Sequence, residues 1–232
     1  EANEDLIQEI PRDRWDWKKF YGDPHEEPGK TKAKWGGFID DHDKFDPLFF
    51  KISPREAESM DPQTRIFLET VWTAIEDAGY PSSAFSGTKT GVFVGVTTMD
   101  YKEMCLRSDV ENGAIDSAMM FQFGLPNRVS YLLNLHGPSE PIDTACSSSL
   151  VAFHRAIESI RMGSSEMAIV GGVNVIVSPS VAIASSGAGM LSEVGRCKSF
   201  DQSADGYVRS EGVGAVILKP LSRARKDKDR IY

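Results

Sequence analysis

The chain reads Asp143-Thr144-Ala145-Cys146-Ser147-Ser148-Ser149-Leu150 between a short apolar approach and a segment with helical spacing. Apolar residues recur in that segment at intervals of three and four, and they are Leu150, Phe153, Ile157 and Ile160. This spacing predicts an amphipathic helix with these residues as its apolar stripe, ending at Gly163. A helix N-terminus presents unpaired N–H groups and partial positive charge, and both favour a thiolate over a thiol. Cys146 is therefore a candidate nucleophile.

The local pattern leaves two interpretations of Cys146 open. In the first, the sulfur is a reachable nucleophile, because the serines at 147–149 suit a first turn and Ala145 leaves the approach uncrowded. In the second, Cys146 is a buried structural thiol, which is a common fate for a cysteine among small residues.

A nucleophilic cysteine normally works with a base within hydrogen-bond reach. His154 lies eight residues after Cys146, and on a helix this is a rise of about 12 Å, too far for direct proton transfer. We interpret His154 as a packing or polar helix residue. His136 is expected in a loop, and His25 and His42 in an irregular front segment, so no histidine completes the site.

The composition is that of a globular protein, and it limits the possible partners. With 232 residues, 41% of them hydrophobic and 26% charged, the chain can form one large domain or two small ones. The net charge of -8 argues against nucleic acid as the main partner. Two basic clusters are each expected to be a solvated face or to receive an acidic partner protein: Arg12, Arg14, Lys18 and Lys19, and Arg223, Arg225, Lys226, Lys228 and Arg230.

Cysteine usage and hydropathy bear on the compartment. Cys105, Cys146 and Cys197 are widely spaced and odd in number, so they fit neither a disulfide framework nor a Cys-x-x-Cys metal site. A reducing cytoplasm is the simpler interpretation, and the acidic start of the chain lacks the pattern of a signal peptide. Residues 167–192 are uncharged, but polar residues and glycines interrupt them. Two buried strands with loops explain that stretch better than a membrane span.

Regular structural signals follow the irregular front segment. Residues 1–50 predict an extended segment, and residues 51–232 the part that carries the nucleophile. Asp61 and Pro62 open a predicted helix that ends at Gly79, with an apolar stripe of Ile66, Phe67, Val71, Ile75 and Ala78. Other expected elements are strands at 91–96, at 167–170 with continuation through 173–177, and at 213–218, an extended approach to Cys146, and a helix within 115–123. This alternation predicts an α/β layered fold with Cys146 at a strand-to-helix junction, where such sheets place chemistry.

Motifs for metals and nucleotides fail in detail. Residues 201–206 mimic the opening of a calcium loop, but the twelfth position, which should be acidic, is Gly212, and Glu211 comes one residue early. The glycine pairs at 187–189 and 212–214 lack the third glycine of a dinucleotide fingerprint and the lysine of a phosphate loop. We expect no metal site and no directly bound cofactor.

Ordered motifs run through most of the chain. They are WGGFI at 35–39, FDPLFF at 45–50, ISPREA at 52–57, MDPQ at 60–63, NRVSY at 127–131, GPS at 137–139, the cysteine motif at 143–150, GMLS at 189–192, RCKSFD at 196–201 and ADGYVRSEG at 204–212. Together they closely resemble the β-ketoacyl synthase family, specifically the ketosynthase domains of modular polyketide synthases. The segment EIPRDRW at 9–15 resembles the polyketide branch of that family.

The resemblance implies a fold and a reaction. The fold would be the N-terminal half of a thiolase-like layered αβαβα structure. By family analogy Cys146 accepts an acyl group from the phosphopantetheine arm of an acyl carrier protein, and its backbone N–H is one donor of the oxyanion hole. A malonyl-type extender then loses CO₂ and attacks the Cys146 thioester in a decarboxylative Claisen condensation. The implied partners are acyl carrier protein, other polyketide synthase domains and a second copy in a homodimer.

The chain also departs from the family pattern. The family places two catalytic histidines, a lysine and a second oxyanion donor in a C-terminal half, and its first strand with a glycine-rich turn precedes the position of Glu1. We therefore expect an N-terminal fragment that is inactive alone. Two alternatives remain: a non-condensing acyl-transfer ketosynthase, and a carrier-protein docking or scaffold module in which the cysteine is incidental.

Overall fold

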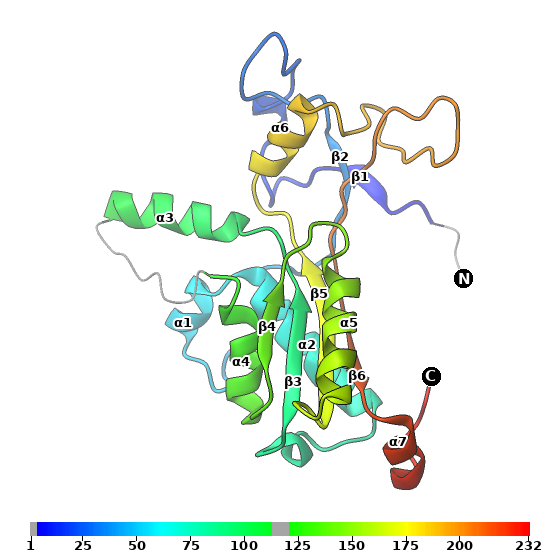
Figure 1. Cartoon of the computed structure of the whole chain (residues 1–232). Helices are drawn as coiled ribbons and strands as arrows, with labels where there is room; N and C mark the ends of the chain where they lie inside the picture. Colours follow the sequence, from blue (N-terminus) through cyan, green and yellow to red (C-terminus); the bar gives the residue numbers. More distant parts are fainter. Residues whose placement is uncertain (1–3, 113–120) are drawn as a thin grey trace. The chain divides into compact units, whose positions relative to one another are not determined.

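The computed structural model of the chain describes residues 4–112 and 121–232 (Figure 1). Most of the helix expected within 115–123 lies outside these residues. The chain forms two compact units, each assembled from segments that are distant in sequence. The first joins Glu1–Asp41 with Val175–Gly212, and the second joins His42–Asn174 with Val213–Tyr232. The division at residue 50 inferred from sequence signals stays a prediction.

A four-stranded sheet forms the centre of the second unit. Its strand order is β4 (Ser139–Ile142), β3 (Thr90–Gly95), β5 (Met167–Asn174) and β6 (Gly212–Leu218). β3 pairs in parallel with both β4 and β5, and every residue of β3 is buried. Gly95 is in register with Ile142 and with Gly172, so the carboxyl ends of three strands meet at one edge. The strands predicted at 91–96, 167–170 and 213–218 and the α/β class are confirmed.

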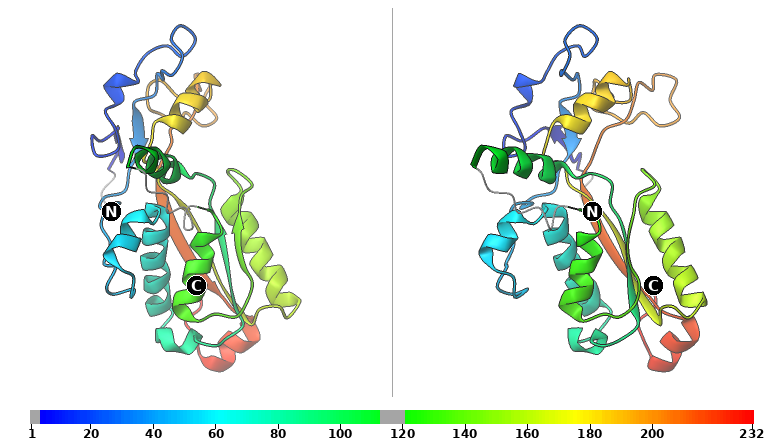
Figure 2. Two further views of the ribbon diagram at one scale, coloured as in Figure 1. Left: turned by 90° about the vertical axis from the view of Figure 1, so that its left-hand side faces the viewer. Right: turned by 60° about the vertical axis from the view of Figure 1, so that its left-hand side comes forward.

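Helices cover both faces of this sheet. α2 (Pro62–Asp77) and α4 (Gly124–Leu133) lie on one side, and α5 (Ser148–Arg161) lies on the other (Figure 2). The second unit also contains α1 (Pro54–Ser59), α3 (Asp100–Asn112) and α7 (Leu221–Asp227), with a 3-10 turn at Ser82–Phe85. Among the described residues, no helix has the length and apolar character needed to cross a membrane.

α2 forms as the sequence predicts. Pro62 occupies its first turn, and the Asp61 carboxylate accepts a 2.8 Å hydrogen bond from the Gln63 backbone N–H. This capping satisfies one of the amides that a helix start leaves without a partner. Burial raises the pKa of Asp61 to about 6, although hydrogen bonds from Gln63 act in the opposite direction. The helix ends where Gly79 adopts a positive φ of 77°.

The predicted apolar stripe of α5 is wrong in its first half. Leu150 is 76% exposed and Phe153 is 37% exposed, whereas Ile160 packs against the core. The buried face of the helix is made by small residues, which are Ser148, Ala152, Ala156 and Ser159. Sheet residues explain the difference, because a Cβ on Gly95 would lie 2.5 Å from the Ser149 nitrogen. A helix that approaches a sheet this closely has no room for large side chains on the contacting face.

The uncharged stretch at 167–192 contains one strand and one helix, so the prediction of two strands is wrong. β5 ends at Asn174, and the continuation through residues 175–177 is buried but lies outside the sheet. Residues Ser180–Gly187 then form α6, in the first unit. Small residues dominate α6 and are compatible with a helix, and its apolar content gave the strand-like signal.

A buried ion pair joins distant segments of the first unit. This unit also contains the antiparallel strands β1 (Ile7–Glu9) and β2 (Trp35–Gly37), a 3-10 turn at Trp17–Lys19, and α6. Arg14 Nε and Nη2 donate to the two carboxylate oxygens of Glu211 at 3.0 and 2.8 Å. Glu211 also accepts from the backbone N–H groups of Ile39 and Ile176 at 3.0 and 2.8 Å. Both charged side chains are at most 1% exposed, so Arg14 does not belong to the predicted solvated basic face.

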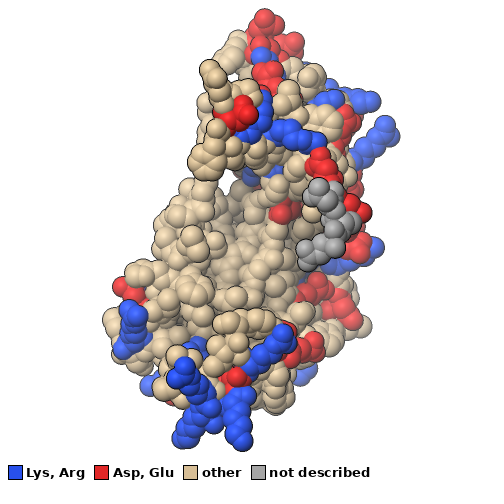
Figure 3. All heavy atoms as spheres, turned by 90° about the vertical axis from the view of Figure 1, so that its right-hand side faces the viewer, with Lys and Arg blue, Asp and Glu red and all other residues tan. Residues whose placement is uncertain are grey.

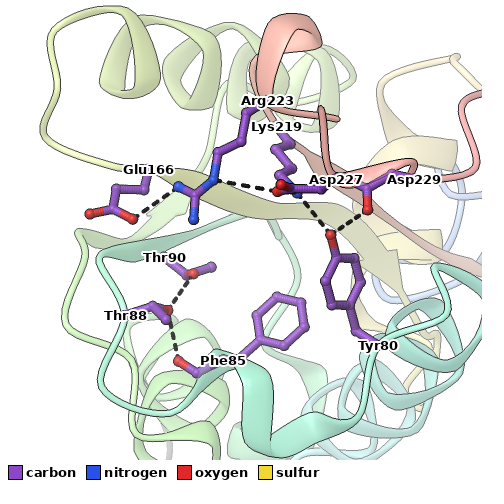
Figure 4. A network of polar contacts seen from close by, with 9 residues as sticks. All are labelled: Tyr80, Phe85, Thr88, Thr90, Glu166, Lys219, Arg223, Asp227 and Asp229. Atoms are coloured by element: carbon purple, nitrogen blue, oxygen red, sulfur yellow. Dashed lines mark hydrogen bonds and ion pairs between the residues drawn. The ribbon is translucent and has the colours of Figure 1, made fainter. Parts of the chain in front are cut away.

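A second buried cation holds the end of β6 in the second unit (Figure 4). Lys219 Nζ donates to Asp227 at 2.5 Å, to Asp229 at 2.7 Å and to the Tyr80 hydroxyl at 2.8 Å. Burial alone would lower the pKa of Lys219. Its hydrogen bonds to the two aspartates and to Tyr80 together raise the pKa by more, so the net shift is upward. Arg223, Arg225 and Lys226 are exposed on α7, and Arg223 forms ion pairs with Glu166 and Asp227. Figure 3 shows Lys and Arg side chains at the lower edge, where α7 lies in Figure 1.

We expect Glu211→Gln to lower the free energy of unfolding by about 3–5 kcal/mol, because it removes the buried counter-charge of Arg14. The guanidinium is then left with the exposed carboxylate of Asp13, 3.1 Å from its Nη1. Urea unfolding of the two proteins would measure the change. Glu193→Gln is the matched control in the same unit, since Glu193 forms an exposed ion pair with Lys32 and should change stability by about 1 kcal/mol or less. Equal losses in both variants would contradict a special role for the buried pair.

Asp61 makes the stability of the chain depend on pH. Its carboxyl has a higher pKa in the folded chain, about 6 against 3.8, so the folded state binds more protons between these values. Stability from this group is therefore lost as pH rises from about 4 to about 6, by about 3 kcal/mol. Asp61→Asn keeps the helix cap without the charge, so its unfolding free energy should fall less over that range. Unchanged pH dependence in urea titrations would refute the assignment.

Candidate active site

Cys146 lies in the turn between a strand and a helix, as the sequence predicts. β4 ends at Ile142 and α5 begins at Ser148, so the sulfur stands two residues before the first helical residue. The turn follows the sheet edge where the carboxyl ends of β3, β4 and β5 meet. Cys146 is exposed. Exposure in this chain agrees with a reachable thiol and disagrees with the interpretation of a buried structural cysteine.

The residue before the cysteine is held in an uncommon backbone conformation. Ala145 has a φ of 55°, in the left-handed region that a non-glycine residue enters at a cost of about 1–3 kcal/mol. Its N–H donates to Asp143 Oδ1 at 3.1 Å, and its C=O accepts from Ser148 Oγ at 2.6 Å. Ser148 Oγ also accepts from the Thr144 N–H at 2.9 Å. Side chains on both sides of the cysteine therefore hold the strained residue in place.

Two glycines at the sheet edge fix the position of the helix start. A Cβ on Gly95 would lie 2.5 Å from the Ser149 nitrogen, and a Cβ on Gly172 would lie 2.8 Å from the Ser149 Cβ. The first of these contacts involves backbone, which cannot move aside without displacing the first turn of α5. Local spacing in the sequence gave no signal for this role, because the two glycines contact the helix only after the sheet has formed.

A carboxylate close to the turn stays ionised. The backbone N–H of Ala145 is the main cause of a lowered pKa at Asp143. Burial acts in the opposite direction, and hydrogen bonds from the side chains of Thr97 and Gln122 lower the pKa further. Thr97 Oγ1 donates to Asp143 Oδ1 at 3.0 Å. Gln122 Nε2 donates to the carbonyls of Val96 and Thr97 at 3.2 and 3.1 Å. Sequence reasoning missed Thr97 and Gln122, since both come from segments remote from the cysteine motif.

The other residues considered from the sequence have different surroundings. His154 is exposed on α5 with its Nε2 3.5 Å from Glu158, in agreement with a polar helix residue. His136 Nε2 lies 3.3 Å from Asn134 Oδ1. Cys197 is exposed in the first unit and accepts a hydrogen bond from the Val208 N–H at 3.1 Å. Within residues 4–112 and 121–232, no three His, Cys, Asp or Glu side chains are grouped to hold a metal ion.

We expect Gly95→Ala to slow alkylation of Cys146 by iodoacetamide and to lower the melting temperature. The added Cβ collides with the backbone at Ser149 and must displace the helix start that presents the sulfur. Labelling would be followed by mass spectrometry and unfolding by circular dichroism. Gly214→Ala in β6 is the control, because a Cβ there meets nothing within 4 Å. Wild-type labelling and stability in Gly95→Ala would contradict the steric argument.

Comparison with known proteins agrees with this architecture. Residues 1–224 match the family described as "Beta-ketoacyl synthase, N-terminal domain". Polyketide synthases PksN and PksM of Bacillus subtilis are 54% and 52% identical over 98% and 97% of this chain, which spans only 4% and 5% of their lengths.

Solved structures give the same assignment. The oxazolomycin ketosynthase domain OzmH KS7 of Streptomyces albus superposes with a TM-score of 0.91 at 45% identity, over 97% of this chain and 40% of that one. The module 6 ketosynthase of the Bacillus subtilis bacillaene synthase gives 0.83 at 43% identity, over 97% and 37%. The fold is thus the N-terminal half of a thiolase-like domain. The chain belongs to the β-ketoacyl synthase family, among the ketosynthase domains of polyketide synthases.

Proposed function

We propose that Cys146 is the acyl-accepting nucleophile of a condensing ketosynthase. The observation that carries this proposal is an exposed cysteine on a strained turn directly before α5. The Cys146 thiolate attacks the thioester carbonyl of an acyl chain held on the phosphopantetheine arm of an acyl carrier protein. A new S–C bond forms, the bond to the pantetheine sulfur breaks, and the leaving thiolate takes up a proton.

The start of α5 favours this step electrostatically. Negative charge develops first on the sulfur and then on the carbonyl oxygen of the tetrahedral intermediate. The unpaired N–H groups and partial positive charge of a helix N-terminus stabilise anions nearby. We assign the backbone N–H of Cys146 as one oxyanion donor, and such a donor typically accelerates acyl transfer by about 10²–10³-fold. The ionised Asp143 opposes anion formation, which makes the orientation of these dipoles more important.

The second step forms the carbon–carbon bond. A malonyl-type extender on a carrier protein loses CO₂, and the resulting carbanion attacks the carbonyl carbon of the Cys146 thioester. The C–S bond breaks, and a β-ketoacyl product stays on the carrier protein. His154 lies on the exposed face of α5, 3.5 Å from Glu158 and eight residues from Cys146, and His136 contacts Asn134, so we assign neither histidine to decarboxylation. We assign that task to the C-terminal half of a complete domain and expect this chain alone to be inactive in condensation.

The proposed reaction requires a prosthetic group and partner proteins. The only prosthetic group involved is the phosphopantetheine of the carrier protein, which arrives with the substrate. The partners are the acyl carrier protein, neighbouring synthase domains and a second ketosynthase in a homodimer, acting in the cytoplasm. Acyl transfer without condensation uses the same Cys146 chemistry and differs only in the decarboxylation step. A docking module with an incidental cysteine has no need for the strained turn at Ala145.

Incubation of the complete ketosynthase with an acyl-carrier-protein thioester should give an acyl adduct on Cys146, located by peptide mass spectrometry. Cys146→Ala should abolish the adduct, because no other group replaces the sulfur at the helix start. Cys197→Ala is the matched control, since it also removes an exposed thiol and should acylate at the wild-type rate.

Persistence of the adduct in Cys146→Ala would refute the assignment. Addition of malonyl carrier protein then distinguishes a condensing ketosynthase from a non-condensing acyl-transfer domain. Release of CO₂ with a β-ketoacyl product supports condensation, whereas stable acylation without CO₂ release identifies a non-condensing acyl-transfer domain.

A further inference from the structure

We propose that Thr97 is a positioning residue for the acylation of Cys146, an inference that rests on the proposed function. Thr97 lies two residues after β3, about fifty residues before the cysteine turn. Its Oγ1 donates to Asp143 Oδ1 at 3.0 Å and lies 3.4 Å from Ser148 Oγ. These are the two side chains that hold the N–H and the C=O of Ala145. One hydroxyl thus contacts both supports of the strained residue.

Thr97 acts on Ala145 mainly through Asp143, because Asp143 accepts the hydrogen bond that the Thr97 hydroxyl donates. Ser148 Oγ donates its proton to the Ala145 carbonyl at 2.6 Å and accepts from the Thr144 N–H. The Thr97 proton is therefore directed to Asp143 Oδ1, which also accepts the Ala145 N–H. Without the Thr97 hydroxyl, water can compete for this exposed carboxylate and the side chain gains rotational freedom. The support on the N–H side of Ala145 is then weakened.

Because Ala145 is strained, the loss of a hydrogen bond that supports it allows its backbone to rotate and changes the orientation of the Cys146 sulfur. A residue in the left-handed region relaxes toward ordinary backbone angles unless its surroundings prevent it. Rotation at Ala145 moves the peptide that joins it to Cys146, and with it the Cys146 N–H and the sulfur. Reaction rates depend steeply on such alignment, and a displacement of about 1 Å can cost about 10²-fold.

The Thr97 hydroxyl can be removed by substitution without disturbing the fold. Gln122 Nε2 holds the carbonyls of Val96 and Thr97 at 3.2 and 3.1 Å, so the backbone after β3 is fixed without the hydroxyl. The Thr97 side chain is exposed, and valine has nearly the same shape. Thr97→Val therefore removes the hydrogen bond without leaving a cavity in the core. Thr97→Ser keeps a hydroxyl in the same place.

The test measures single-turnover acylation of the complete ketosynthase by an acyl-carrier-protein thioester. We expect Thr97→Val to lower the maximal acylation rate by about tenfold, the value of one hydrogen bond of about 1.4 kcal/mol, with little change in half-saturating substrate concentration. Thr97→Ser should restore most of the rate. Thr98→Val is the matched control, because Thr98 lies in the same segment but bonds to Gln63 and Asn174. Thermal unfolding of all variants tests whether the fold is retained.

The possible results separate the hypotheses. A wild-type rate in Thr97→Val, a similar loss in Thr98→Val, or a loss that follows the melting temperature would overturn the positioning role. Failure of Thr97→Ser to recover the rate would also contradict it. If Cys146→Ala still forms the acyl adduct, the proposed function itself fails. Loss of acylation in Cys146→Ala beside full activity in Thr97→Val rejects only the positioning role.

Discussion

The close approach of α5 to the sheet is the constraint on which the candidate active site depends. Gly95 and Gly172 lack the side-chain atoms that would keep the first turn of α5 away from β3 and β5. Small residues on the contacting face of the helix complete this fit. Because the helix start is fixed against the sheet edge, only a short turn remains between β4 and α5. That turn accommodates Ala145 in a left-handed conformation and presents Cys146 to solvent.

Those parts of the fold that depend on local pattern could be predicted from the sequence. The apolar run of β3 and the Asp61-Pro62 start of α2 are local signals, and both elements formed as expected. The family and the position of Cys146 before a helix followed from motifs within short segments. The orientation of α5 could not be predicted in this way, because its buried face is selected by glycines in β3 and β5. The role of Thr97 was equally hidden, since it depends on the spatial neighbourhood of two strand ends.

Charge patterns were the least reliable guide to the surface. Arg14 lies among basic residues near the start of the chain, yet it is buried against Glu211, whose carboxylate also accepts from two backbone amides. Asp227 and Asp229 alternate with basic residues in the sequence, yet both bond to the buried Lys219. In each case a buried cation requires carboxylates, and the carboxylates come from distant segments or from the alternating run itself. The net charge of a sequence segment therefore does not give the charge of its surface.

The exposed apolar residues of α5 have a consequence for how the chain behaves as an isolated polypeptide. Leu150 and Phe153, one turn apart, form a ridge on the side of the helix that does not contact the sheet. Met162 adds a further exposed apolar side chain just after the last helical residue. Exposed apolar side chains on one helix favour self-association and bind hydrophobic dyes. The tendency to self-associate and the close packing on the sheet thus have the same cause, because the helix directs its small residues toward the sheet and leaves large apolar ones in solvent.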